Sequence, residues 1–179
     1  MKIFLMTAPL VMEEQRQLTA LLNEAVSLGA SIGYTDAVMQ YPAMQKYWEQ
    51  QSVIMAEGKV HIFCAQANNK IIGVVGLEAC TKPNGDHRGE IFKLIVSAQW
   101  RRRGVARQLM TVATEFAAQL GLKLLVLDTR SDDITVDFYQ SLGWIKAGVI
   151  PHYAQSTLGE YQATTLMYLP LTPDTQNIL

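Results

Sequence analysis

One segment in the second half of the chain joins two apolar, strand-like runs through a polar turn and an amphipathic helix. The apolar runs are residues 91–96 and 123–128, and a helical stripe extends from Val105 to Leu120 between them. A strand, a crossover helix and a second strand pair in parallel within one sheet. This segment therefore requires a sheet that contains a parallel pair and carries helices on its faces.

The turn that opens this helix is basic and contains small residues at two positions, Gly104 and Ala106. The first amide hydrogens of a helix have no partner within the helix, and the helix dipole gives this end a positive potential. Small residues let the main chain approach an anion closely. The turn thus predicts a backbone cradle for a phosphate group. A solvated basic turn, or a weak nucleic-acid patch, is the alternative interpretation.

Hydrophobic spacing and turn signals outline the other elements. Helices are expected over residues 10–28, 42–58 and 134–142, and strands over residues 60–67, 71–77, 89–96, 144–149 and 163–169. A first strand near the N-terminus leads into the first helix. The pattern predicts an antiparallel meander followed by the parallel pair, which gives a mixed sheet in a single domain over residues 1–179.

Composition narrows the class of function. A net charge of -1 argues against a general binder of nucleic acid, and no apolar run is long enough to span a membrane. The cysteines, Cys64 and Cys80, are expected to be reduced thiols on neighbouring strands, which suits a cytoplasmic enzyme. The histidines are isolated, so no metal site is expected.

Two motifs together resemble the GNAT superfamily of acetyl-CoA-dependent N-acetyltransferases. The superfamily's cofactor motif reads Gln/Arg-x-x-Gly-x-Gly/Ala, which Arg101, Gly104 and Ala106 match, and residues 138–144 read FYQSLGW. The resemblance covers nearly the whole chain. It implies an α/β (α+β) fold in which about four helices flank a mixed, mostly antiparallel sheet of about seven strands with a splayed parallel pair.

The resemblance also implies acetyl-CoA as the donor and assigns its contacts mostly to main-chain groups. Amides of residues 102–107 would hold the pyrophosphate, and the strand before the turn would hold the acetyl carbonyl and the pantetheine. Arginine side chains of the turn would meet the 3′-phosphate. The residues implied at this site are Leu94, Ile95, Val96, Arg101, Arg102, Arg103, Gly104, Val105, Ala106 and Arg107.

Three residues are candidates for proton transfer. An amine acceptor is largely protonated near neutral pH and must lose a proton before it attacks a thioester. Glu90 and Asp128 are candidate bases, directly or through water, and the resemblance implies that Tyr139 protonates the departing thiolate. The alternatives are an exposed strand residue for Glu90, a turn-capping side chain for Asp128 and a core aromatic for Tyr139.

A narrower resemblance, to tabtoxin resistance acetyltransferases, rests on four short segments at residues 29–34, 82–85, 107–110 and 127–129. It implies an amino-acid-like or β-lactam antibiotic as the acceptor, and hence a role in antibiotic resistance. A polyamine, an aminoglycoside, a peptide N-terminus or a hydroxyl acceptor stays open, as does a non-catalytic acyl-CoA sensor. Neither nucleic acid nor membrane is expected as a partner, and a homodimer is conceivable.

Overall fold

The computed structural model describes residues 1–131 and 134–171. Its strands are β1 (Lys2–Leu5), β2 (Val60–Ala67), β3 (Lys70–Ala79), β4 (Arg88–Val96), β5 (Leu124–Arg130), β6 (Ile145–Gln155) and β7 (Tyr161–Pro170). Its helices are α1 (Ala8–Glu13), α2 (Gln15–Ser27), α3 (Tyr41–Ala56), α4 (Val105–Gln119) and α5 (Thr135–Gln140), with a 3-10 turn, η1, over Ala98–Trp100. Within the described ranges the strands form one sheet in the order β1-β2-β3-β4-β5-β7-β6.

The N-terminal half of the sheet is the predicted antiparallel meander. The pairs β1–β2, β2–β3 and β3–β4 are antiparallel, and the β2–β3 turn holds Asn68 and Asn69 at φ values of 50° and 58°. Two consecutive positive φ values are what a tight hairpin turn needs, and asparagine tolerates them well. The first hairpin of the predicted antiparallel meander is therefore confirmed.

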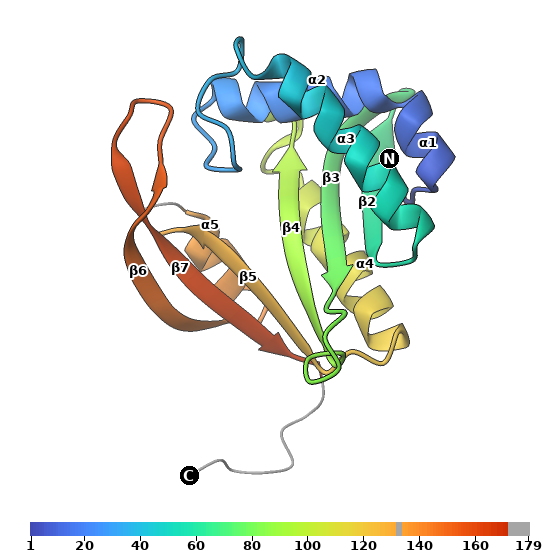
Figure 1. Cartoon of the computed structure of the whole chain (residues 1–179), viewed down its shortest axis with the longest axis vertical. Helices are drawn as coiled ribbons and strands as arrows, with labels where there is room; N and C mark the ends of the chain where they lie inside the picture. The colour runs from blue at the N-terminus through green and yellow to red at the C-terminus, as the bar shows by residue number, and fades with distance from the viewer. Residues whose placement is uncertain (132–133, 172–179) are drawn as a thin grey trace.

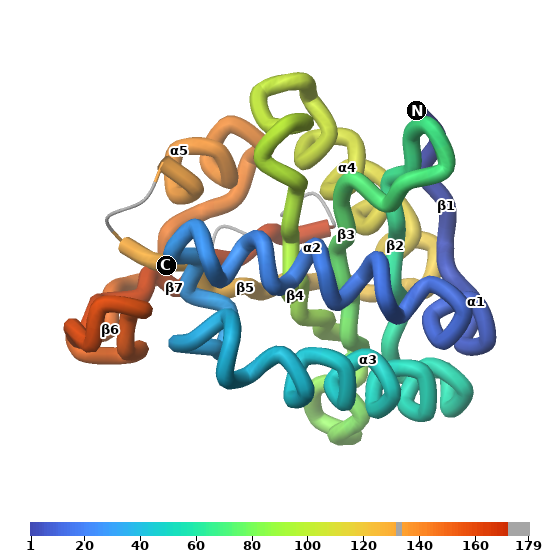
Figure 2. The backbone as a smooth tube through the Cα atoms, turned by 90° about the horizontal axis from the view of Figure 1, so that it is seen from above, coloured from blue at the N-terminus to red at the C-terminus, as the bar shows by residue number. Residues whose placement is uncertain are grey.

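Helices cover both faces of this half, as Figure 2 shows for α3 and α4. One hydrophobic cluster contains buried residues of α1, α2 and α3, with Leu18, Leu22 and Trp48 among its largest side chains. The other contains the buried stripe of α4, including Leu109 and Met110, together with β5 and α5. The sheet thus separates two cores, and the mixed α/β architecture expected from the sequence is confirmed.

The parallel pair is short, and this shapes the rest of the molecule. β4 and β5 pair in parallel only at Arg88, Gly89 and Glu90, with α4 as the crossover. From that point the two strands diverge, so that β5, β7 and β6 lean away from β4 (Figure 1). The splayed pair that the resemblance implied is present.

Most element boundaries lie within two residues of the sequence prediction, and the first helix and β6 show the larger differences. The helix expected over residues 10–28 is divided into α1 and α2 at Glu14, and α1 starts earlier because Thr7 caps it and Pro9 occupies its first turn. β6 runs to Gln155 rather than ending at residue 149. The pairing with β7 shifts register between Ile150 and Ala154, where His152 has a φ of 53°. This irregularity lets the strand continue beyond residue 149.

Candidate active site

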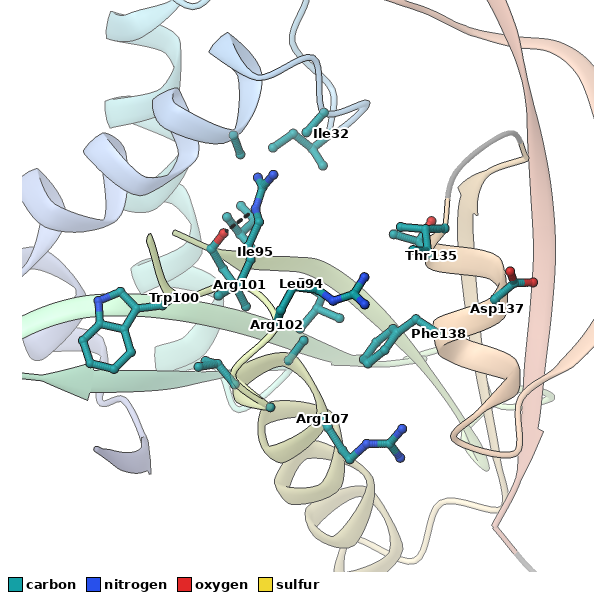
Figure 3. Close-up of a pocket in the computed structure, with 17 residues that line it drawn as sticks. Ile32, Leu94, Ile95, Trp100, Arg101, Arg102, Arg107, Thr135, Asp137 and Phe138 are labelled. Atoms are coloured by element: carbon teal, nitrogen blue, oxygen red, sulfur yellow. Dashed lines mark hydrogen bonds between the residues drawn. The ribbon is translucent and has the colours of Figure 1, made fainter. Parts of the chain in front are cut away.

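A cavity of about 710 Å³ lies where β4 and β5 diverge. Its walls come from the end of α2 and the segment after it, from the last residues of β4, from the basic turn and from α5 (Figure 3). Its lining residues are Ala25, Ala30, Ile32, Leu94, Ile95, Val96, Trp100, Arg101, Arg102, Gly104, Val105, Ala106, Arg107, Ile134, Thr135, Asp137 and Phe138. This volume falls in the range of small-molecule sites.

The basic turn presents main-chain N–H groups to this cavity. Gly104 precedes α4 with a φ of 79°, and Arg102 has a φ of 60°. The first hydrogen bond into the helix runs from the Gln108 N–H to the Gly104 carbonyl. Across the described residues, no acceptor bonds the N–H groups of residues 105–107. Free donors at the positive end of a long helix are the geometry that the predicted phosphate cradle requires.

The arginine side chains of the turn have different surroundings. Nε of Arg101 donates to the Val96 carbonyl at 3.3 Å, and a guanidinium nitrogen of Arg107 donates to Ser141 Oγ at 2.9 Å. Arg103 packs over the Trp100 ring at 5.1 Å and is not among the residues that line the cavity. Arg102 extends toward the α5 side of the cavity (Figure 3). Arg102 is therefore the side chain best placed for a further phosphate.

The end of β4 forms the floor of the cavity. Ile95 and Val96 pair with β3 on one side, whereas no residue of β4 after Glu90 pairs with β5 on the other. The main-chain groups of residues 94–96 that face the splay therefore have no strand partner there. Strand-like hydrogen bonding to an extended ligand chain is the chemistry that this edge offers.

The two candidate bases lie on either side of the splay. Glu90 pairs directly with Glu78 on β3 and, in parallel, with Val126, two residues before Asp128 on β5. Glu90 is exposed, which is the alternative that the sequence left open, and it is not among the residues that line the cavity. Partial desolvation nevertheless raises the pKa of Glu90, and the charges of Asp128 and Glu78 add to that effect, while those of Arg88 and Lys93 oppose it. A carboxyl with a raised pKa holds a proton at higher pH than usual, which suits a general base.

Asp128 has a specific partner on the neighbouring strand. The Thr164 hydroxyl on β7 lies 3.0 Å from Asp128 Oδ2 and 2.9 Å from the Thr129 carbonyl. The Asp128 side chain thus bonds across the sheet rather than capping the turn that follows it, which was the alternative expected from the sequence.

Tyr139 is deeply buried, with 7% of its surface exposed. It belongs to the α4-side core, and its ring lies 5.2 Å from that of Phe138 and 6.0 Å from that of Trp144. Phe138 lines the cavity, whereas Tyr139 is not among the lining residues. The packing anticipated as the alternative for Tyr139 is present, and its role as an acid is a proposal.

The structure adds residues that the sequence did not single out. Lys93 points to the same side of the sheet as α3, and its Nζ lies 5.3 Å from the Tyr47 ring centroid. Ile32, in the segment after α2, lines the cavity, while Asp36 accepts hydrogen bonds from the main-chain N–H groups of Val38 and Met39 and serves as a local cap. His152 lies outside the lining, beside Tyr161.

Residues 1–131 and 134–171 contain no group of three or more His, Cys, Asp or Glu side chains arranged to hold a metal ion. None of the helices in these ranges is both long and apolar enough to cross a membrane.

Solved structures share this fold at low sequence identity. The chain matches ribosomal-protein-alanine N-acetyltransferase from Brucella melitensis with a TM-score of 0.78 and 17% identity, over 95% of this chain and 99% of that one. It matches Salmonella typhimurium yncA, solved with its cofactor acetyl-CoA, with a TM-score of 0.76 and 16% identity, over 99% of each chain. At such identities the matches establish the fold alone.

Sequence comparison leads to the family. Human N-acetyltransferase 8 is 31% identical over 86 residues, which are 47% of this chain and 38% of that protein. Rat N-acetyltransferase family 8 member 2 is 30% identical over 105 residues, 58% of this chain and 44% of that protein. The alignments thus span less than half of these relatives. The family model described as "Acetyltransferase (GNAT) family" matches residues 19–144, most of the chain, which therefore belongs to that family.

Proposed function

We propose that this chain transfers the acetyl group of acetyl-CoA to an amine, or a hydroxyl, of a small molecule, by direct attack in a ternary complex. The observation that carries the proposal is the cavity at the β4–β5 splay, which joins an unpaired strand edge to the free N–H groups of α4. These two features suit a ligand with an extended amide-containing arm and a pyrophosphate. Acetyl-CoA has both.

The donor would lie along the splay. The N–H groups of residues 105–107 would hold the pyrophosphate, Arg102 would face the additional phosphate, and the main chain of residues 94–96 would hold the pantetheine and acetyl carbonyl. When bound, acetyl-CoA supplies an activated thioester. The chain's contribution is to orient that thioester and to polarise its carbonyl.

The acceptor would approach from the α3 side, where Glu90 lies. Glu90 takes the amine proton, directly or through water, and the raised pKa of its carboxyl suits that role. Asp128, held by Thr164, contributes negative charge that keeps the acceptor amine oriented. The amine nitrogen then forms its bond to the acetyl carbon as the C–S bond breaks. Tyr139 supplies the proton that converts the departing thiolate to a thiol.

The acceptor in this proposal is amino-acid-like, and a β-lactam antibiotic such as tabtoxin is one example. The supporting observations are the opposite charges of Glu90 and Lys93, which lie close to each other on β4, and the resemblance to tabtoxin resistance enzymes. We place the reaction in the cytoplasm, because both cysteines within the described residues are free thiols. A homodimer fits the proposal but is not required for it.

The experiment is a steady-state assay of thiol release from acetyl-CoA over a panel of primary amines, with the mass of each product measured. Glu90→Gln should lower kcat by about a hundredfold or more while leaving acetyl-CoA binding unchanged, as loss of a general base does. Tyr139→Phe should lower kcat with a change in the basic limb of the pH profile. Tight CoA binding with no turnover on any acceptor would instead favour an acyl-CoA sensor.

A further inference from the structure

Lys93 lies at an irregularity of β4 that directs its side chain. Opposite it on β3, Val74 pairs with Ile95 and Gly76 pairs with Phe92, so two residues of β4 face a single residue of β3. Lys93 itself has a φ of 52°, a value uncommon for a residue with a side chain. The combination is a β-bulge, and such bulges re-aim side chains near functional sites.

Because of the bulge, Lys93 lies on the opposite face of the sheet from the one that strict alternation along β4 would give it. Phe92 packs on Gly76, where an added Cβ would lie 2.2 Å from the ring, and it belongs to the α3-side core. Leu94 packs against the opposite, α4-side core. Because Lys93 Nζ lies over the Tyr47 ring of α3, it shares the face of Phe92 rather than alternating with it. Lys93 therefore lies on the acceptor side of the sheet.

The surroundings of this ammonium are partly desolvated and lack a close counterion. Burial lowers the pKa of Lys93, whereas the charges of Asp128 and Glu90 raise it. Neither carboxylate lies within the 4.0 Å of an ion pair, and no other described carboxylate does. The buried Tyr47 hydroxyl likewise has no hydrogen-bond partner in the described ranges. A partly buried ammonium without an ion-pair partner and a buried hydroxyl without a hydrogen-bond partner favour the binding of a ligand that pairs with them.

Lys93 is also next to the cavity that holds the donor in the proposed function. A Cβ on Gly33 would lie 3.8 Å from Lys93 Nζ, and the preceding residue, Ile32, lines that cavity. In the segment after α2, Ile32 therefore lines the donor cavity, and the next residue, Gly33, lies beside the Lys93 ammonium. A small acceptor held at Lys93 would remain near the transferred group.

We propose that the Lys93 ammonium binds a carboxylate of the acceptor, which makes the acceptor a small molecule that carries both a primary amine and a carboxylate. This inference rests on the proposed function. The carboxylate would pair with Lys93 while the amine faces Glu90 and Asp128, so that opposite charges meet at both ends of the acceptor. A polyamine would place a second cation near Lys93 and would be repelled.

The test compares acceptors that differ only in the carboxylate. Each α-amino acid in the panel is assayed beside its amide, with wild type, Lys93→Met and Lys93→Arg. Lys93→Met should lower kcat/KM for the amino acid by about ten- to a hundredfold, mainly through KM, and should leave the amide unchanged. Lys93→Arg should retain most of the preference for the amino acid.

Lys46→Met is the matched control, because it removes an equal charge from an exposed position on α3, beside Tyr47. It should leave both acceptors unaffected. A thermal melt checks that each variant is folded, and Lys93→Gln replaces Lys93→Met if that variant is not. Equal losses for amino acid and amide would overturn the inference, since they would indicate a general effect on Glu90. A preference of the wild-type protein for diamines over amino acids would also overturn the inference.

A direct binding measurement separates this inference from the proposed function. Equilibrium dialysis of the amino acids against the protein with CoA bound needs no turnover. If wild type transfers acetyl to no acceptor, the proposed function fails, but weaker amino-acid binding by Lys93→Met would still support the role of Lys93. Equal binding by the two proteins would contradict it.

Discussion

Gly104→Ala tests whether the main chain at the start of α4 binds the pyrophosphate. Gly104 has a φ of 79°, a conformation that costs a residue with a side chain about 1–2 kcal/mol. An added Cβ would meet only Gln108 Nε2, at 4.0 Å, so the protein itself offers no clash. The stability loss should therefore be the strain alone. The new methyl group would, however, stand beside the N–H groups that face the cavity.

Gly121→Ala supplies the matched control at the other end of the same helix. Gly121 has a φ of 82°, and an added Cβ there would have nothing within 4 Å. It does not line the cavity. Both variants should thus lose about 1–2 kcal/mol of unfolding free energy in urea titrations, and the two values should agree closely.

Calorimetric titration with acetyl-CoA then distinguishes the two positions. Disturbing one charge-assisted hydrogen bond to a phosphate corresponds to about 1.5–3 kcal/mol, or roughly ten- to a hundredfold in Kd. We expect that loss for Gly104→Ala and an unchanged Kd for Gly121→Ala. Equal affinity in the two variants would refute the assignment of the pyrophosphate to this turn.

Two other predictions concern ionisable groups. If Glu90 is the base, kcat/KM falls as the pH drops through the raised pKa of its carboxyl, and pH–rate profiles should shift in opposite directions in two variants. Glu78→Gln removes a negative charge that raises this pKa, so the acid limb should move to lower pH, whereas Arg88→Gln should move it to higher pH; a shared direction would contradict the assignment. Burial raises the pKa of the Cys64 thiol to about 12, while Cys80 is partly exposed. A thiol reagent at neutral pH should therefore modify one cysteine of the folded protein and both only after unfolding; two fast thiols would contradict the packing.

Much of the fold follows from local patterns. The strand, helix and strand around the basic turn require the parallel pair, and the Asn68-Asn69 turn requires the β2–β3 hairpin, because each feature acts over a few residues. The cavity-lining positions of Arg102 and Gly104 follow from the same turn. Local patterns therefore predict the turn on which the proposed donor site depends.

The acceptor side depends on contacts between distant residues, which single-sequence patterns do not contain. Strict alternation along β4 would place Lys93 on the face opposite Phe92, and only the bulge brings it to Tyr47 on α3. Likewise, Asp128 bonds Thr164 because β5 and β7 are neighbours in the sheet. The register that joins these residues arises from the assembled sheet, so the sequence could nominate Asp128 but could not identify its partner.

Amide hydrogen exchange, resolved by residue with NMR and measured with and without acetyl-CoA, shows whether the start of α4 binds the pyrophosphate. The N–H groups of residues 105–107 have no acceptor in the described chain and should exchange rapidly in the free protein. With acetyl-CoA bound, their exchange should slow strongly, as should that of residues 94–96. Binding that leaves residues 105–107 in fast exchange would contradict the account, since the phosphates would then lie elsewhere.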